Sequence, residues 1–129
     1  MNLHYNMKPI DMNQPMLEID GTTAMQNIYD KNDTEFQNKN GFPKVIGQKP
    51  FTLKDAVIGC LNHVSQGQGP EDSFKAGMLI VKVNKSSLET EYEAEEITLI
   101  KKKAKEVLPP QTMIAVCELI EGKENPYKQ

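Results

Sequence analysis

The four lysines Lys101, Lys102, Lys103 and Lys105 form a local cluster of basic side chains. Ammonium groups this close together could bind the phosphates of a nucleotide or a nucleic acid. Tyr and Phe do not alternate with the lysines, as stacking on bases would require. The chain also has no Arg, the side chain that reads bases and phosphates through two parallel hydrogen bonds. We therefore expect a solvated helix face here, keep a small phosphorylated ligand as the alternative, and disfavour nucleic acid.

A glycine-rich stretch, SQGQGPED at 65–72, precedes a predicted helix. The free backbone amides at a helix start can hold an anion. The GxxxxGK[ST] spacing of a phosphate-binding loop is absent, however, and Glu71 and Asp72 would repel phosphate. An ordinary turn between two helices is the favoured interpretation.

Other side chains with catalytic potential lack partners in the sequence. Cys60 and Cys117 fall on apolar helical faces, which predicts reduced core thiols. His63 lies at the end of a predicted helix and is expected to be structural or at the surface. The acids between 91 and 96 are typical of a helix start rather than of an acid–base pair. Because there is no CxxC, HxxxH or other metal-ligand spacing, we predict no metal, no cofactor, no catalytic residue and no enzymatic activity.

Apolar spacing predicts four helices that would position these residues. The first begins at Thr52, which forms a candidate capping box with Asp55. A second candidate box pairs Thr90 with Glu93. The helix over 70–84 is apolar around most of its circumference and is expected to be the most buried element, with the others packed around it. The remaining two helices are expected at about 93–108 and 111–121, separated by a double proline.

The first 50 residues are polar and rich in turn signals. Residues 7–19 are expected to form a small hairpin around Asn13-Gln14. Residues 25–29 suit either a helical turn or a strand. Residues 30–50 are expected to form a long loop, with a short strand at 44–46. The predicted fold is mostly α within the α+β class: an N-terminal β-hairpin and polar segment (1–50), a compact four-helix domain (51–122) and a flexible tail (123–129).

Composition limits the size of the core. The chain has 129 residues, 38% apolar, and a net charge of −3. The dense apolar runs lie in 51–121, so about 70 residues must supply most of the core. Help is expected from self-association or from the N-terminal segment packing back on the helices. Met7, Met12, Met16 and Met25 are expected to fill gaps in the core, with an adaptable contact surface as the alternative. The N-terminal sequence lacks the apolar stretch of an export signal or a membrane span, so we expect a cytoplasmic protein with no membrane partner.

Three segments of the chain resemble small phage and prophage proteins in the order of their predicted helices. They are FTLKDAVIGCLNHV, GPEDSFKAGMLIVKV and EAEEITLIKKKAKEVLPPQTMIAVCELIEG. The resemblance covers about residues 50–122 and, weakly, residues 7–19, and the long polar segment 26–50 departs from it. It implies a phage context in a bacterial host cell and carries over no catalytic residues. We expect a non-enzymatic accessory or assembly protein that binds protein, itself included. The alternative is an anti-defence protein that binds a host factor or a phosphorylated small molecule.

Overall fold

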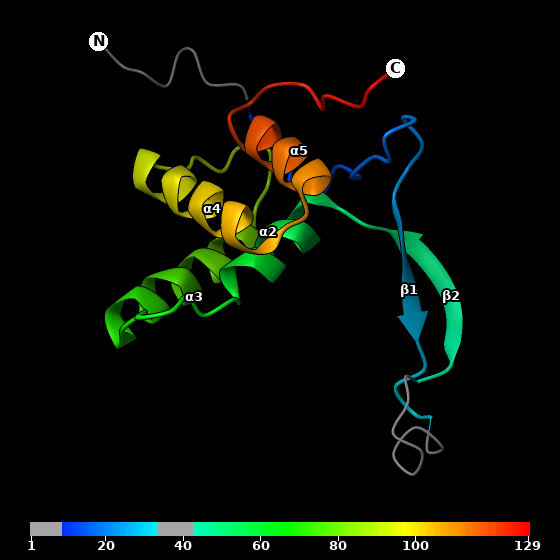
Figure 1. The fold of residues 1–129 in the computed structure, drawn as a ribbon, viewed down its shortest axis with the longest axis horizontal. Helices are drawn as coiled ribbons and strands as arrows, with labels where there is room; N and C mark the ends of the chain where they lie inside the picture. The colour runs from blue at the N-terminus through cyan, green and yellow to red at the C-terminus, as the bar shows by residue number, and fades with distance from the viewer. Residues whose placement is uncertain (1–8, 34–42) are drawn as a thin grey trace.

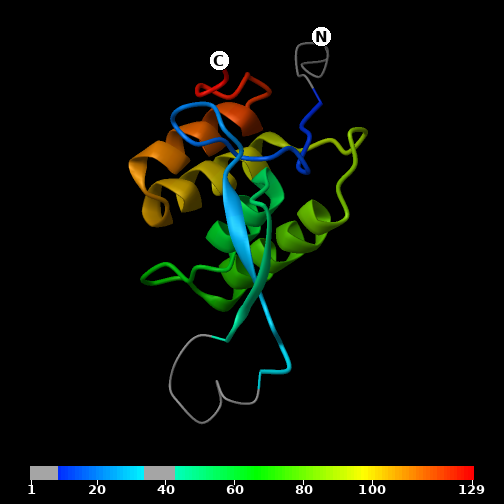
Figure 2. The ribbon, with the colours of Figure 1, turned by 90° about the vertical axis from the view of Figure 1, so that its right-hand side faces the viewer.

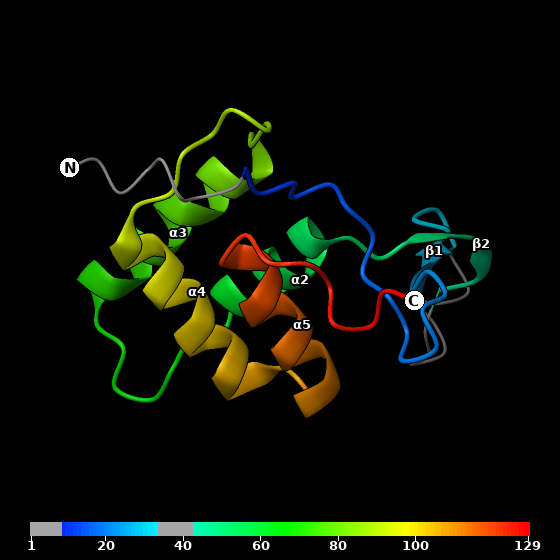
Figure 3. The same ribbon diagram turned by 90° about the horizontal axis from the view of Figure 1, so that it is seen from above.

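The computed structural model describes residues 9–33 and 43–129. It contains a two-stranded antiparallel hairpin followed by four helices, which confirms the predicted mostly helical α+β class. The hairpin projects to one side of the helical body (Figures 1 and 3). The elements are β1 (Met25–Tyr29), β2 (Val45–Pro50), α2 (Leu53–Leu61), α3 (Pro70–Asn84), α4 (Ala94–Val107) and α5 (Pro110–Ile120).

The hairpin lies later in the chain than the turn signals suggested. Met25 pairs with Pro50 and Gln26 with Lys49, so β1 and β2 form the hairpin. Of the predicted 7–19 hairpin, residues 7 and 8 lie outside the described residues. The rest forms only a turn and isolated bridges, because the backbone of Met16 bonds to Phe51 and Ala24 instead. Remote backbone partners thus replaced the local pairing that the sequence predicted.

Local capping chemistry sets where the helices begin. The Thr52–Asp55 capping box is confirmed, and α2 follows directly. The Thr90–Glu93 box is wrong, because the Thr90 hydroxyl accepts from the Ser87 amide. Glu93 precedes α4 instead, and its amide donates to the Glu96 carboxylate at 2.8 Å. Pro70 and Pro110 open α3 and α5, where a missing N–H costs nothing.

The nine-residue α2, and not α3, lies at the centre of the helical body. It packs against α3, α4 and α5, and it buries Leu53, Ala56, Val57, Cys60 and Leu61. The expectation that the 70–84 helix would be the most buried element is therefore wrong. Only Ala76, Leu79 and Val83 of α3 are buried, because α3 lies at the edge of the body and packs chiefly on α2.

The N-terminal segment contributes to the same hydrophobic core as the helices. Ile10, Met12 and Met16 are buried in it, next to α2 and α5 residues. The favoured gap-filling role is confirmed for Met12 and Met16, and the alternative of a contact surface is wrong for these two residues. Met25 is 47% exposed on β1, and Met7 lies outside the described residues. The residues that precede the hairpin thus contribute apolar side chains to the small hydrophobic core.

The C-terminal residues also pack on the body. Asn125 is buried, and the Tyr127 hydroxyl donates to the Gln111 carbonyl at 2.7 Å. Figure 3 shows this segment running back over α5 toward the start of the hairpin.

Candidate functional site

The four clustered lysines do not share one face of α4. Lys101 forms an ion pair with Glu121 at the end of α5. Lys103 is buried, whereas Lys102 and Lys105 are exposed and form no ion pair with the described part of the chain. The expectation of one solvated lysine face is therefore wrong for Lys103 and Lys101. The sequence could not show this, because the partners come from other elements.

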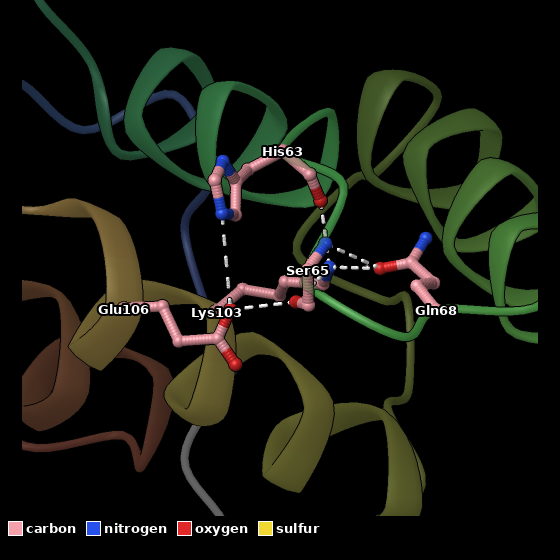
Figure 4. Close-up of polar contacts among 5 residues, drawn as sticks. All are labelled: His63, Ser65, Gln68, Lys103 and Glu106. Atoms are coloured by element: carbon pink, nitrogen blue, oxygen red, sulfur yellow. Dashed lines mark hydrogen bonds and ion pairs between the residues drawn. The ribbon is translucent and has the colours of Figure 1, made fainter.

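Lys103 holds the segment between α2 and α3 in place (Figure 4). Its side chain is only 3% exposed. The ammonium donates to the His63 carbonyl at 2.6 Å, to the Ser65 hydroxyl at 2.8 Å and to the side-chain oxygen of Gln68. A lysine ammonium has three N–H donors, and all three are used here. The burial of Lys103 and its three hydrogen bonds indicate a structural role.

Glu106 compensates part of this buried positive charge. Its carboxylate accepts from the Ser65 hydroxyl at 2.6 Å and lies 3.9 Å from Nε2 of His63 (Figure 4). The pKa of Glu106 is lowered, first by the Ser65 hydrogen bond and then by the charges of nearby lysines. His63 itself lies at the surface beyond the end of α2, as predicted from the sequence.

The 65–72 turn and α4 together border a pocket of about 310 Å³. The turn supplies Ser65, Gln66, Gly67 and Gln68, and Gly67 adopts φ +80°, which favours glycine. The structure thus brings together the glycine-rich turn and the lysine-bearing helix α4, which are far apart in the sequence. The charges that line the pocket are mixed, since Lys75 and Lys102 line it together with Asp72 and Glu95. A phosphate group would meet repulsion here as well as attraction.

A second candidate site is the apolar outer side of α3. Phe74 is 69% exposed, Met78 55% and Val81 47%. Spacings of four and three residues place these side chains in one row along the helix. We call these three residues the α3 face. The sequence showed the side chains but not their exposure, because an all-round apolar helix normally indicates burial.

A pocket of about 400 Å³ lies beside the α3 face, between α3 and α4. Leu79 and Leu99 line it together with Phe74 and Met78. At its edge, Lys82 pairs with Glu96 at 2.7 Å and lies 4.9 Å from the centre of the Tyr92 ring. The lysine charge is therefore compensated, and the pocket is suited to apolar side chains.

The two thiols are not arranged as nucleophiles. Burial raises the pKa of Cys60 to about 11, and burial also raises the pKa of Cys117. Both are free thiols. Among residues 9–33 and 43–129, His, Cys, Asp and Glu form no group of three that could hold a metal ion.

No described helix combines the length and the apolar character needed to cross a membrane. Comparisons with protein-family profiles, with curated proteins and with solved structures found no match to this chain.

Proposed function

We propose that this chain is a non-enzymatic accessory or assembly protein that acts by binding another protein through the α3 face. The observation that carries the proposal is the exposure of Phe74, Met78 and Val81 in one row. Exposed apolar rows beside an apolar pocket are typical of protein-binding surfaces. Burying each of these side chains would contribute about 1.5–3 kcal/mol before the cost of association.

The non-enzymatic part of the proposal is supported by the state of the candidate catalytic groups. Lys103 uses every donor to hold the backbone and side chains of 63–68. Cys60, with its raised pKa, stays protonated at neutral pH. Neither group is poised to react with a substrate.

The cellular setting is also part of the proposal. The resemblance of residues 50–122 to small phage and prophage proteins supports a phage context in a bacterial host cell. A protein-binding role suits an accessory or assembly protein in that setting.

Covalent capture in expressing cells tests the binding function. We would cross-link bacteria that express tagged wild-type, Phe74→Glu or Ile114→Glu chains and identify the captured proteins by mass spectrometry. Ile114 is 48% exposed on α5, so Ile114→Glu is the matched control. We expect wild type and control to capture the same partner, and a cross-linked second copy of the chain counts as a partner. Phe74→Glu should capture at least tenfold less of it. Identical capture by all three proteins would refute the proposed function.

A second candidate function is an anti-defence protein that binds a host factor or a phosphorylated small molecule. The observation that favours the small molecule is the pocket that the 65–68 turn shares with Lys75 and Lys102. A thermal shift on adding nucleotides, lost in the Lys75→Ser/Lys102→Ser double variant, would support it. Retention of the shift by the double variant would exclude this pocket as the binding site.

A further inference from the structure

The α3 face extends at both ends into a longer row that has a charge at each end. Glu71, Phe74, Met78, Val81 and Lys85 follow one another at spacings of three, four, three and four residues. We call these five residues the α3 seam. This spacing averages 3.5 residues, so the five side chains lie along one line of the helix, as in a two-stranded coiled coil. All five are exposed. Lys85 follows the last residue of α3 directly, at the helix cap.

We propose that the partner of the α3 face is a second copy of this chain, with the two α3 helices antiparallel and Met78 on the twofold axis. The proposal rests on the proposed function, since it names the protein that the α3 face binds. Glu71 and Lys85 each lie seven residues from Met78, and Phe74 and Val81 lie four and three residues from it. A twofold axis at Met78 therefore places the charged ends opposite one another and the two apolar neighbours within one residue of register. Phe74 then faces Val81 of the partner subunit, and Met78 faces the partner's Met78.

The charges at the two ends of the seam favour the antiparallel orientation. In this orientation Glu71 lies opposite the partner's Lys85, and the twofold axis repeats the pair at the other end. A parallel pairing would instead place the two Glu71 side chains together and the two Lys85 side chains together. Opposite charges across an interface select orientation, and like charges suppress the alternative. The helix dipoles also oppose one another in the antiparallel pair.

The pocket between α3 and α4 gives the partner's aromatic side chain a place to pack. It opens beside Met78 and Lys82, one turn from the point where the partner's Phe74 crosses α3, and Leu79 and Leu99 form apolar walls. Lys82 is paired with Glu96, so its charge is compensated where the ring of the partner's Phe74 would pack. Aromatic side chains that fill such pockets carry much of the affinity of protein interfaces.

The size of the seam predicts the strength of the dimer. α3 has 15 residues, which corresponds to a length of about 22 Å. Three apolar layers and two end pairs form a small interface, at the low end of the range for specific complexes. We expect a dissociation constant of the order of micromolar, so the dimer must be sought at protein concentrations of about 1–100 μM.

Analytical ultracentrifugation of the purified full chain tests the dimer. We expect wild type and Ile114→Glu to dimerise equally. Met78→Glu brings two carboxylates together on the twofold axis and should weaken the dimer at least about 100-fold. Met78 is 55% exposed, so circular dichroism and the unfolding midpoint should show that the variant is folded.

Charge exchange tests the orientation. Glu71→Lys or Lys85→Glu alone should weaken the dimer about tenfold, because the twofold axis repeats each substitution and two charge pairs are lost. The dissociation constant of the double variant should return to within about threefold of the wild-type value.

Met78→Cys tests the position of the twofold axis independently, since oxidation should form a disulfide between the two copies of this residue.

The possible outcomes separate this inference from the function on which it rests. Dissociation by Met78→Glu, with recovery in the charge-exchanged double variant, supports the antiparallel dimer. A wild-type monomer at 100 μM, or a dimer that Met78→Glu leaves intact, overturns it. The cross-linking experiment with Phe74→Glu then decides separately whether a different protein occupies the α3 face.

Discussion

At the scale of single residues, Lys103 shows how burial changes the role of a charged side chain. Lys101, Lys102 and Lys103 follow one another in the sequence and indicated a basic surface. The side chain of Lys103, however, is buried. There the ammonium joins α4 to the segment between α2 and α3 (Figure 4). Leaving a buried acceptor without its donor costs more than the bond itself contributes.

Lys103→Met should therefore lower the free energy of unfolding by about 2–3 kcal/mol. The methionine keeps the apolar stem, but the His63 carbonyl and the Gln68 side chain lose their donor. Lys102→Met, at the exposed neighbouring position, should change the free energy by less than about 0.5 kcal/mol. Urea unfolding of both variants provides the measurement, and equal effects would contradict the structural role of Lys103.

At the scale of elements, one carboxylate joins the hairpin to α2. Asp55 accepts from the Thr52 amide at 3.0 Å and from the side-chain amide of Gln26, in β1, at 2.8 Å. Burial raises the pKa of Asp55, but the hydrogen bonds from Thr52 and Gln26 outweigh it, so the net pKa is lowered from 3.8. The start of α2 and the first residues of the hairpin are thus stabilised by the same charge.

This lowered pKa gives a pH dependence with a defined sign. A carboxyl group whose pKa is lower in the folded state stabilises the protein above its unfolded pKa of 3.8. The contribution is lost as the pH falls through the folded value. Asp55→Asn should lower the free energy of unfolding by about 1 kcal/mol at pH 7, and the difference from wild type should shrink below the unfolded pKa.

Urea unfolding at pH 7 and at about pH 2.5 checks this prediction. Asp72→Asn, an exposed change in the first turn of α3, serves as the control and should cost less than about 0.5 kcal/mol. A difference between wild type and Asp55→Asn that is the same at both pH values would contradict the assigned role.

At the scale of the whole molecule, the core is completed by residues that lie before the hairpin. The chain passes from the buried Met12 and Met16 out into β1, returns through β2 and enters α2 (Figure 2). The backbone bonds from Lys54 to Met12 and from Met16 to Phe51 fix this path. We therefore expect removal of the N-terminal segment to destabilise the fold, so that such a truncation would not test binding alone.

Met12→Ala should lower the free energy of unfolding by about 2–4 kcal/mol, because the side chain is 2% exposed and leaves a cavity. Met25→Ala, on the exposed side of β1, should cost less than about 0.5 kcal/mol. Thermal or urea unfolding distinguishes the two. A small effect of Met12→Ala would show that the N-terminal segment is not part of the cooperative core.

The sequence by itself determined what depends on neighbouring residues. The Thr52–Asp55 cap and the prolines that open α3 and α5 act within a few residues, so the starts of these three helices were predicted to within about one residue. The Lys101–Lys105 cluster was visible for the same reason.

Only the tertiary structure decided which of these features are covered. The hairpin register depends on backbone partners that lie between 16 and 25 residues apart in the sequence. The burial of Lys103 depends on acceptors in another segment. The apolar row of α3 remains exposed because the short α2 takes the central position against the other helices. Hydrophobic spacing records which side chains can be buried, whereas burial itself requires a second surface, and the packing of the whole chain determines where that surface lies.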